Sequence, residues 1–280
     1  MDHYVVAGNP VEHSQSPFIH AEFARQTGQA MHYGRLLCPL DRFADSLHTL
    51  AASGAKGCNV TVPFKFDAFR AGQRLTERAT LAQAANTLRF DADGWFADNT
   101  DGIGLVNDIE RNAGLPLAHK RVLLIGAGGA SAGALGPLLA AAPGAVVVAN
   151  RSVDKARALV ERHRHVRGSV ALSAATLDDC GTGYDIVINA TASSLQGAAI
   201  PVAPEVLAPG ALALDMMYGP AAQAFLAWAK QHGGRGRDGL GMLVEQAATA
   251  FELWRQVRPD TAPVLAALRS RMNTTARTKA

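Results

Sequence analysis

The stretch RVLLIGAGGASAGALGPLLAAA, residues 121–142, constrains the fold more than any other part of the chain. An apolar run enters a glycine-rich turn, and a helix of small residues follows at once. The next apolar run, AVVVAN at 145–150, indicates a second strand. A strand, glycine turn, helix and strand in this order are typical of a doubly wound parallel sheet, whose helix N-terminus can bind the phosphates of a dinucleotide.

Within this turn, each glycine has a physical reason to be there. Gly126 can make the tight turn, and Gly128 lets backbone N–H groups approach a pyrophosphate. Ser131 stands where a strict fingerprint has its third glycine. A purely structural turn is the alternative, but the flanking strand and helix favour dinucleotide binding. The predicted cofactor loop comprises Gly126, Ala127, Gly128, Gly129 and Ala130.

The end of the second strand indicates which dinucleotide is bound. NAD enzymes commonly place a carboxylate there, on the ribose 2′-hydroxyl. This chain instead has Asn150, Arg151 and Ser152, with Lys155 one turn later. A guanidinium and a hydroxyl can bind a 2′-phosphate, so NADP(H) is favoured over NAD. The alternative is that Arg151 is a solvated residue at a helix start.

The rest of the chain predicts two domains of α/β class. Strand-like and helical runs alternate through the first third, which is typical of a parallel sheet covered by helices. For the first helical run, Ser16 and Pro17 predict an N-cap and first turn, and Gly28 predicts the end. The helices after Gly239 have no strand of their own, so we expect them to return to the first domain. This predicts a substrate-binding domain of residues 1–102 and 239–280, with a Rossmann-like NADP-binding domain, 103–238, inserted.

Composition excludes several classes of protein. The formal net charge is only +3 and the basic residues are scattered, so nucleic-acid binding has no electrostatic support. Three widely spaced cysteines indicate neither a disulfide framework nor a zinc site. No apolar run approaches the length of a membrane span or a signal segment. We therefore expect a cytoplasmic protein with a small-molecule partner and no membrane contact.

The first domain has polar residues near the predicted strand ends. In GCNVTVPFK, residues 57–65, Val60 and Val62 are predicted to share one face, Asn59 and Thr61 the other, and Lys65 follows Pro63. Ser14 and Ser16 lie in a loop that, if extended, would direct both hydroxyls to one side. Asn86 and Asp101 follow later strands.

Each of these residues also has an ordinary structural explanation. The two serines can cap a helix, Asn86 can form a turn, Asp101 can cap the next helix, and Lys65 can be a surface charge. Their joint placement favours a ligand with several hydroxyls and a carboxylate. Hydride transfer to or from an alcohol carbon also needs a group that moves the hydroxyl proton, and a lysine beside an aspartate is a candidate pair.

These motifs together resemble the shikimate dehydrogenase family along essentially the whole chain. The matching segments include GNPVEHSQSP (8–17), GCNVTVPFK (57–65), AANT (84–87), DNTDGIG (98–104), GAGGASAG (126–133), ANRS (149–152), DMMYGP (215–220) and DGLGMLVEQAA (238–248). The resemblance implies NADPH-dependent, reversible reduction of 3-dehydroshikimate to shikimate in aromatic biosynthesis, by an enzyme that is a monomer or a homodimer.

The resemblance also implies roles for residues. Lys65 and Asp101 match the catalytic pair, and Ser14 and Ser16 match the residues on the substrate carboxylate. The remaining substrate residues would be Asn59, Thr61, Asn86, Tyr218 and Gln246. Besides the glycine loop and Asn150, Arg151, Ser152 and Lys155, the cofactor residues would be Thr191, Ala192, Met216, Gly239 and Met242.

Two departures and two alternatives accompany this resemblance. Ala192 replaces a serine that the family often has, and Gln223 replaces a frequent threonine. A dual quinate/shikimate dehydrogenase is one alternative, but Ser16 in the carboxylate loop favours shikimate. A non-catalytic sensor that binds ligand and NADP is the other, and the presence of both Lys65 and Asp101 argues against it.

Overall fold

The computed structural model describes residues 1–191 and 200–279. The chain forms two compact units, of which the first comprises Met1–Gly104 with Leu243–Ala280 and the second Leu105–Met242. The boundaries drawn from the sequence, after residues 102 and 238, lie a few residues away from these. The chain passes between the units within two helices, α5 (Asp101–Asn107) and α9 (Leu240–Arg255).

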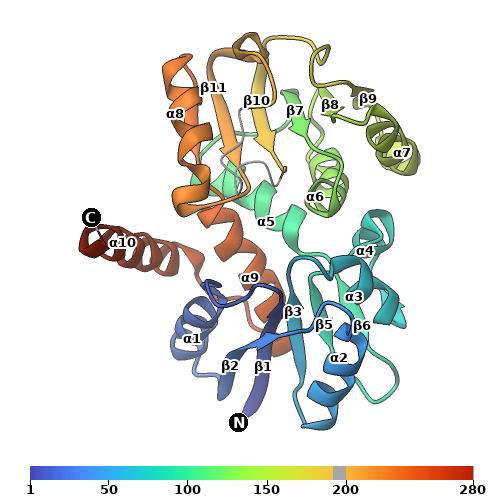
Figure 1. The fold of residues 1–280 in the computed structure, drawn as a ribbon, viewed down its shortest axis with the longest axis vertical. Coiled ribbons are helices and arrows are strands. Elements are labelled where there is room, and N and C mark those ends of the chain that lie inside the picture. The colour runs from blue at the N-terminus through green and yellow to red at the C-terminus, as the bar shows by residue number, and fades with distance from the viewer. Residues whose placement is uncertain (192–199, 280) are drawn as a thin grey trace. The chain divides into compact units, whose positions relative to one another are not determined.

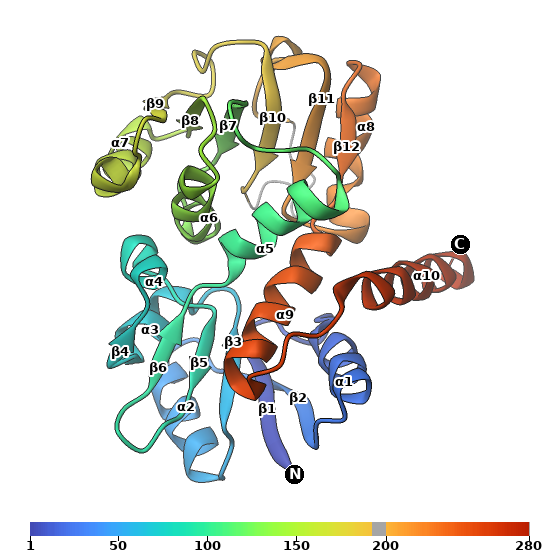
Figure 2. The same ribbon diagram turned by 180° about the vertical axis from the view of Figure 1, so that it is seen from behind.

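In the first unit, the described residues form a six-stranded sheet with the order β2-β1-β3-β5-β6-β4 (Figure 1; β4 is labelled in Figure 2). Its strands are β1 (Asp2–Gly8), β2 (Met31–Leu37), β3 (Gly57–Val60), β4 (Arg74–Leu75), β5 (Thr87–Arg89) and β6 (Phe96–Asp98). The remaining helices of this unit are α1 (Ser16–Thr27), α2 (Phe43–Ala52), α3 (Lys65–Ala71), α4 (Glu77–Ala82) and α10 (Thr261–Lys279).

This sheet is mixed, whereas the sequence predicted a parallel one. Strands β1, β2 and β3 are parallel as predicted, but β5 is antiparallel to both β3 and β6. The short loop between β5 and β6, with Gly94 at a φ of +117°, returns the chain directly. A loop of this length can join only antiparallel neighbours, because a parallel pair needs a crossover connection.

Helix α1 shows the expected start and stop. Pro17 lies in its first turn, where a missing backbone N–H does no harm, and Gly28 ends it in the left-handed conformation with a φ of +67°. Ser16 is the first helical residue, while Gln15 occupies the cap position. The predicted boundaries of this helix are thus confirmed, with the cap shifted by one residue.

Strand β3 is shorter than the sequence predicted. It ends at Val60, which is buried, whereas Val62 is 52% exposed. The prediction that these two valines share a buried face is wrong. The backbone turns here, with the Phe64 N–H donating to the Thr61 carbonyl at 3.1 Å, so the period of two that defines a strand no longer applies beyond Val60.

The second unit contains the predicted doubly wound sheet. Its six described strands have the order β12-β11-β10-β7-β8-β9, and every neighbouring pair is parallel. The strands are β7 (Arg121–Ile125), β8 (Ala145–Ala149), β9 (Ala171–Ala175), β10 (Tyr184–Asn189), β11 (Leu207–Asp215) and β12 (Arg235–Arg237). Its helices include α6 (Gly129–Ala140), α7 (Val153–His163) and α8 (Gln223–Gln231).

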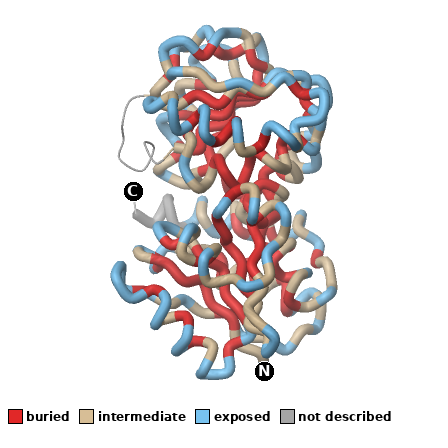
Figure 3. The backbone as a smooth tube through the Cα atoms, turned by 90° about the vertical axis from the view of Figure 1, so that its right-hand side faces the viewer, coloured by how far each residue is buried: buried red, intermediate tan, exposed pale blue. Residues whose placement is uncertain are grey.

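Each sheet has its own apolar core. Figure 3 shows the buried backbone concentrated along the strands, with exposed segments around them. In the first unit, Val5, Cys58 and Leu88 belong to one cluster. On the other face, Trp254 of α9 stacks on Tyr4 and donates its Nε1–H to the Leu88 carbonyl at 3.0 Å. Helix α9, which follows Gly239, thus packs on the first sheet, as predicted (Figure 2).

Among the residues that the structure describes, none of the helices combines the length and the apolar character needed to cross a membrane.

A buried ion pair joins distant parts of the second unit. Asp108 is fully buried in a π-helical turn (Asp108–Asn112) after α5. It accepts from Arg237 Nε at 2.7 Å and Nη2 at 2.5 Å. Gly241 is required beside this pair, because a Cβ there would lie 1.7 Å from Asp108 Oδ1.

We expect Asp108→Ala to destabilise the second unit by about 3–5 kcal/mol, because Arg237 would remain buried without its carboxylate. Calorimetric melting of the full-length protein measures this. Arg157→Ala is the control, since it removes an exposed ion pair with Asp154, and should change stability by less than about 0.5 kcal/mol. Equal melting temperatures for the two variants would contradict the expectation.

Candidate functional site

Lys65 and Asp101 lie together in the first unit. Lys65 Nζ donates to Asp101 Oδ2 at 2.6 Å, although the two residues are 36 positions apart in sequence. Their side chains are 20% and 8% exposed, respectively. Lys65 is the first residue of α3, and Asp101 is the first residue of α5. The fold therefore places an ammonium group, held by a largely buried carboxylate, where solvent still has partial access.

The segment Ala84–Thr87 holds the backbone of this site in place. The Ala85 N–H donates to the Lys65 carbonyl at 2.8 Å. The Asn86 N–H donates to the Asp98 carbonyl at 3.0 Å, and the Asn86 carbonyl accepts from the Val60 N–H at 2.8 Å. A single short segment is thus bonded to the end of β3, the start of α3 and the end of β6.

The side chain of Asn86 organises the polar groups around Asp101. Its Oδ1 accepts from the Thr100 N–H at 2.8 Å, which fixes the orientation of the amide. Its Nδ2 therefore faces acceptors, namely Asp101 Oδ1 at 2.9 Å, Thr100 Oγ1 at 2.9 Å and Gln246 Oε1 at 3.2 Å. Asn86 is 3% exposed, so these bonds form in a region with little competing water.

A line of polar side chains continues from Asn86 behind the site. Thr87 Oγ1 donates to Asn86 Oδ1 at 3.0 Å and accepts from Asn59 Nδ2 at 3.0 Å. Asn59 Oδ1 accepts from the Tyr33 hydroxyl at 2.7 Å. Burial raises the pKa of Tyr33 well above its usual value, which keeps this hydroxyl a donor. Both hydrogen-bonding groups of the Asn59 amide are therefore engaged within the protein.

Sequence reasoning missed Tyr33 and Thr100. Tyr33 lies on an edge strand and pairs in register with Tyr4, and Thr100 lies inside the DNTDGIG segment. Thr100 is fully buried, and its position directly before Asp101 was an available signal. Nothing local to the sequence indicates that Tyr33 meets Asn59.

Ser14 and Ser16 are brought together as predicted, but for another reason. Their hydroxyl oxygens are 3.2 Å apart, and the Ser16 N–H donates to Ser14 Oγ at 3.3 Å. The intervening Gln15 has helical dihedral angles, so the extended loop that was predicted is wrong. The start of α1 at Ser16 produces the turn. Ser16 is buried and Ser14 half-buried.

Thr61 is half-buried and lies against the end of β1. Its N–H donates to the Ala7 carbonyl at 2.9 Å. A Cβ at Gly8 would lie 2.3 Å from Thr61 Cγ2, so Gly8 leaves the space that this side chain fills.

His20 lies on α1 and is fully buried. Its ring stacks on Tyr33, with centroids 4.1 Å apart and planes 7° apart. Neither ring nitrogen has a hydrogen-bond partner among the described residues. Burial lowers the pKa of His20 to about 3, so the imidazole is neutral at neutral pH and contributes an aromatic surface rather than a charge.

The glycine loop of the second unit has the geometry that its sequence predicts. Gly126 has a φ of +108°, which disfavours any side chain. Gly128 directly precedes α6, and the direction in which its Cβ would point is open. Gly129 is the first residue of α6, and Ala127 and Ala130 are half-buried beside it. Ser131 is fully buried, and its hydroxyl lacks a partner among the described residues.

The basic segment after β8 is exposed. Asn150 Nδ2 donates to the Ser152 carbonyl at 2.9 Å and thereby closes the turn into α7. Arg151, Ser152 and Lys155 are exposed. Arg151 makes no hydrogen bond or ion pair with the part of the chain that is described. Its guanidinium is therefore available to a ligand.

The other predicted cofactor residues also lie on the second unit. Thr191 Oγ1 donates to Asn189 Oδ1 at 2.7 Å at the end of β10, while Met216 and Met242 are buried. Gly239 packs so closely on the backbone that a Cβ would lie 2.2 Å from the Met216 carbonyl oxygen. Ala192 lies outside the described residues. Tyr218, predicted to bind substrate, belongs to this unit, unlike the other substrate residues.

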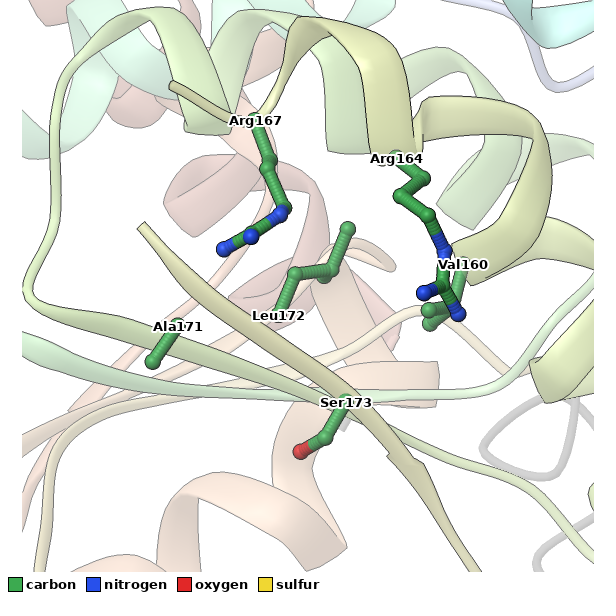
Figure 4. A pocket seen from close by; sticks show the side chains of 6 residues that line it. All are labelled: Val160, Arg164, Arg167, Ala171, Leu172 and Ser173. Carbon is green, nitrogen blue, oxygen red and sulfur yellow. The ribbon is translucent and has the colours of Figure 1, made fainter. Parts of the chain in front are cut away.

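A separate pocket opens at the far end of α7 (Figure 4). It has a volume of about 280 Å³ and contains none of the predicted site residues. Both of its arginines already have partners, because Arg164 pairs with Glu161 and Arg167 Nη1 donates to the Val170 carbonyl at 2.9 Å. The pocket is lined by Val160, Arg164, Arg167, Ala171, Leu172 and Ser173.

Three family models match successive parts of the chain. They are described as the shikimate dehydrogenase substrate binding domain (residues 6–88), shikimate / quinate 5-dehydrogenase (109–197) and the shikimate 5′-dehydrogenase C-terminal domain (239–269). A shikimate dehydrogenase (NADP(+)) of Methylibium petroleiphilum is 64% identical over 277 residues, covering 96% of this chain and 94% of that protein. The chain belongs to the shikimate dehydrogenase family.

Solved structures agree with this membership. An Ael1 enzyme from Pseudomonas putida is 44% identical, with a TM-score of 0.86 over 96% of this chain and 98% of that one. The shikimate 5-dehydrogenase of Thermus thermophilus, solved with NADP(H) and shikimate, is 30% identical, with a TM-score of 0.85 over 96% and 99%. The shikimate dehydrogenase fold predicted from sequence, a two-domain α/β architecture, is thus confirmed.

We expect Asn86→Leu to lower the stability of the first unit, because the Thr100 N–H, Asp101 Oδ1 and Gln246 Oε1 all lose a buried partner. Each unpaired buried group costs about 1–3 kcal/mol. Urea unfolding followed by circular dichroism measures the loss. Asn112→Leu is the control, since it removes an amide from the second unit. A first-unit transition that is unchanged in Asn86→Leu would refute the role given to this amide.

Proposed function

We propose that this protein catalyses the reversible NADPH-dependent reduction of 3-dehydroshikimate to shikimate, in the biosynthesis of aromatic compounds. The observation that carries the proposal is the Lys65–Asp101 pair at 2.6 Å, set in the Asn86 network. The names of the most similar curated relatives support the same substrate and cofactor.

Lys65 is proposed to handle the proton of the reacting oxygen. In the reducing direction, its Nζ donates a proton to the carbonyl oxygen as that oxygen gains charge. In the oxidising direction, the amine accepts the hydroxyl proton. Asp101 Oδ2 holds the ammonium in place, and Asn86 Nδ2 in turn holds Asp101 Oδ1. The pair thus acts as a proton donor with its geometry fixed before substrate binds.

The other polar groups suit the remaining functional groups of shikimate. Ser14 and Ser16 present two adjacent hydroxyls that can bind a carboxylate. Asn86 and Gln246, with Asn59 and Thr61, can orient ring hydroxyls. Tyr218, a residue of the second unit, is also proposed to bind substrate. Asn59 is already engaged on both sides of its amide, so its contribution includes fixing Thr87 and, through it, Asn86.

The second unit fits NADP(H) by its own structure. The start of α6 can bind a pyrophosphate. Gly126 turns the backbone with a positive φ, the space beside Gly128 is open, and the buried Ser131 hydroxyl has no partner among the described residues. Arg151, Ser152 and Lys155 offer a guanidinium, a hydroxyl and an ammonium for the 2′-phosphate. Thr191, Ala192, Met216, Gly239 and Met242 are proposed to line the remainder. When bound, NADPH supplies the hydride.

The proposed cellular setting is the cytoplasm. All three cysteines are buried and unpaired, which suits a reducing compartment. Burial raises the pKa of the Cys58 thiol well above its usual value, so this cysteine is not a nucleophile.

A dual quinate/shikimate dehydrogenase is the second candidate, since one matching family model covers both activities. Initial rates with shikimate and quinate, each with NADP and NAD, separate the two. Comparable catalytic efficiency on both acids would favour the second candidate.

We expect Lys65→Met to lower kcat by about 10²- to 10⁴-fold, because it removes the group that moves the proton. NADPH binding, followed by fluorescence titration, should be unchanged. Lys56→Met is the matched control, as it lies in the same unit without contacting this network. Near-normal turnover of the Lys65 variant would exclude the proposed mechanism. If the protein were a non-catalytic sensor, the unmodified protein would show no turnover either.

We expect Arg151→Ala to raise KM for NADPH by about tenfold or more, because a charge-assisted bond contributes about 1.5–3 kcal/mol. KM for NADH should change little, since NADH has no 2′-phosphate. Steady-state kinetics with both cofactors test this, with Arg157→Ala, an exposed arginine on the following helix α7, as control. A parallel rise for both cofactors would remove Arg151 from the phosphate site.

A further inference from the structure

A second ion pair includes Asp98, which lies three residues before Asp101 in the chain. Arg78, on α4, contacts Asp98 at the end of β6. Its Nε donates to Asp98 Oδ1 at 2.7 Å, and its Nη2 donates to Oδ2. The contact is bidentate, which is the geometry that fixes a carboxylate most firmly.

Asp98 cannot be satisfied without such a partner. Its side chain is fully buried, while Arg78 is 32% exposed. Asp98 Oδ1 also accepts from Thr76 Oγ1 and from the Asn99 N–H, both at 2.7 Å. A buried carboxylate is costly unless it is paired and hydrogen-bonded. Arg78 provides that cation.

The bonds of Asp98 lead to the proposed catalytic pair in two short steps. The Asn99 N–H is fixed by Asp98, and the Asn99 side chain donates to the Ala84 carbonyl at 2.9 Å. Asn99 Oδ1 accepts from the Asp101 N–H at 3.2 Å. The turn from β6 into α5, which places Asp101, is therefore built on the Asp98 carboxylate.

We propose that Arg78 is a positioning residue for the reaction, which through Asp98 and Asn99 fixes where Asp101 holds the Lys65 ammonium. This inference rests on the proposed function, because it concerns the same pair. Arg78 forms no hydrogen bond or ion pair with Lys65 or Asp101 in the described structure, so it acts on catalysis through the turn. Loss of the guanidinium should displace Asp101 slightly and leave the second unit, with its cofactor residues, unaffected.

Arg74 provides a matched control in the same unit. It also forms a double contact, with Asp91 and with Asp93, and its side chain is 39% exposed. Its partners lie in the loop between β5 and β6, away from residues 98–101. Arg74→Met should therefore leave the reaction unchanged and destabilise the unit less than Arg78→Met, because Asp91 and Asp93 are 25% and 72% exposed and remain hydrated without the arginine.

The test compares Arg78→Met, Arg78→Lys and Arg74→Met in the full-length protein. We expect Arg78→Met to lower kcat with shikimate by about ten- to a hundredfold, the range for a small misplacement of catalytic groups. KM for NADP should stay constant, and the melting temperature should fall further than that of Arg74→Met while staying above the assay temperature. Arg78→Lys should fold normally and still lose part of kcat, because an ammonium cannot make the bidentate contact.

Chemical rescue makes the test specific. Millimolar guanidinium chloride, far below denaturing concentrations, should restore much of kcat in Arg78→Met, whereas sodium chloride at the same ionic strength should not. Guanidinium should have no effect on Arg74→Met. If Arg78 had only a structural role, guanidinium would not restore kcat in Arg78→Met while leaving Arg74→Met unchanged.

Two results would overturn the inference. One is an Arg78→Lys variant that folds normally and retains full kcat. The other is a loss of kcat in Arg78→Met that also occurs in Arg74→Met and that guanidinium does not restore. An unmodified protein without activity on shikimate would instead refute the proposed function, so the two failures are distinguishable.

Discussion

The amide of Asn86 is the interaction on which the first unit's polar site depends. Because the Thr100 N–H fixes its oxygen, its nitrogen must face Asp101 and Gln246. The same residue bonds through its backbone to both neighbouring strands. One short segment thus fixes groups from β3, β6, α5 and α9, which share no local sequence relationship. A buried network of this kind is stable only when every member has a partner, and that requirement makes its geometry unique.

Charge is distributed differently in the two units. The first unit buries carboxylates against cations near its polar site, as Asp98 with Arg78 and Asp101 with Lys65 illustrate. In the second unit, the basic residues after β8 are exposed, and Arg151 has no carboxylate partner among the described residues. The loop before α6 offers backbone N–H groups. The first arrangement suits controlled proton transfer, and the second suits an anionic ligand that brings its own charge.

Sequence patterns predicted local features well, but they predicted the direction and length of paired strands poorly. The glycine turn into α6 and the ends of α1 follow from residues adjacent in the chain, and their predictions hold in the structure. The antiparallel position of β5 and the early end of β3 did not follow from periodicity. Alternation in a sequence indicates which residues share a face, but hydrogen bonds between strands decide the direction and the length of a strand. The extended loop predicted for Ser14 to Ser16 was wrong for a similar reason, since a helix starts there instead.

By itself, the sequence determined the residue types that the chemistry needs: a lysine after Pro63, an aspartate in DNTDGIG, glycines before a helix and a basic segment after a strand. Family motifs in order and at regular spacing identified the same set. Only the tertiary structure decided that Lys65 Nζ meets Asp101 Oδ2, that Tyr33 supports Asn59, and that Arg78 balances Asp98. These contacts join residues 20 to 36 positions apart. Such contacts form because burial leaves polar groups no water to bind, so each must find its partner across the fold.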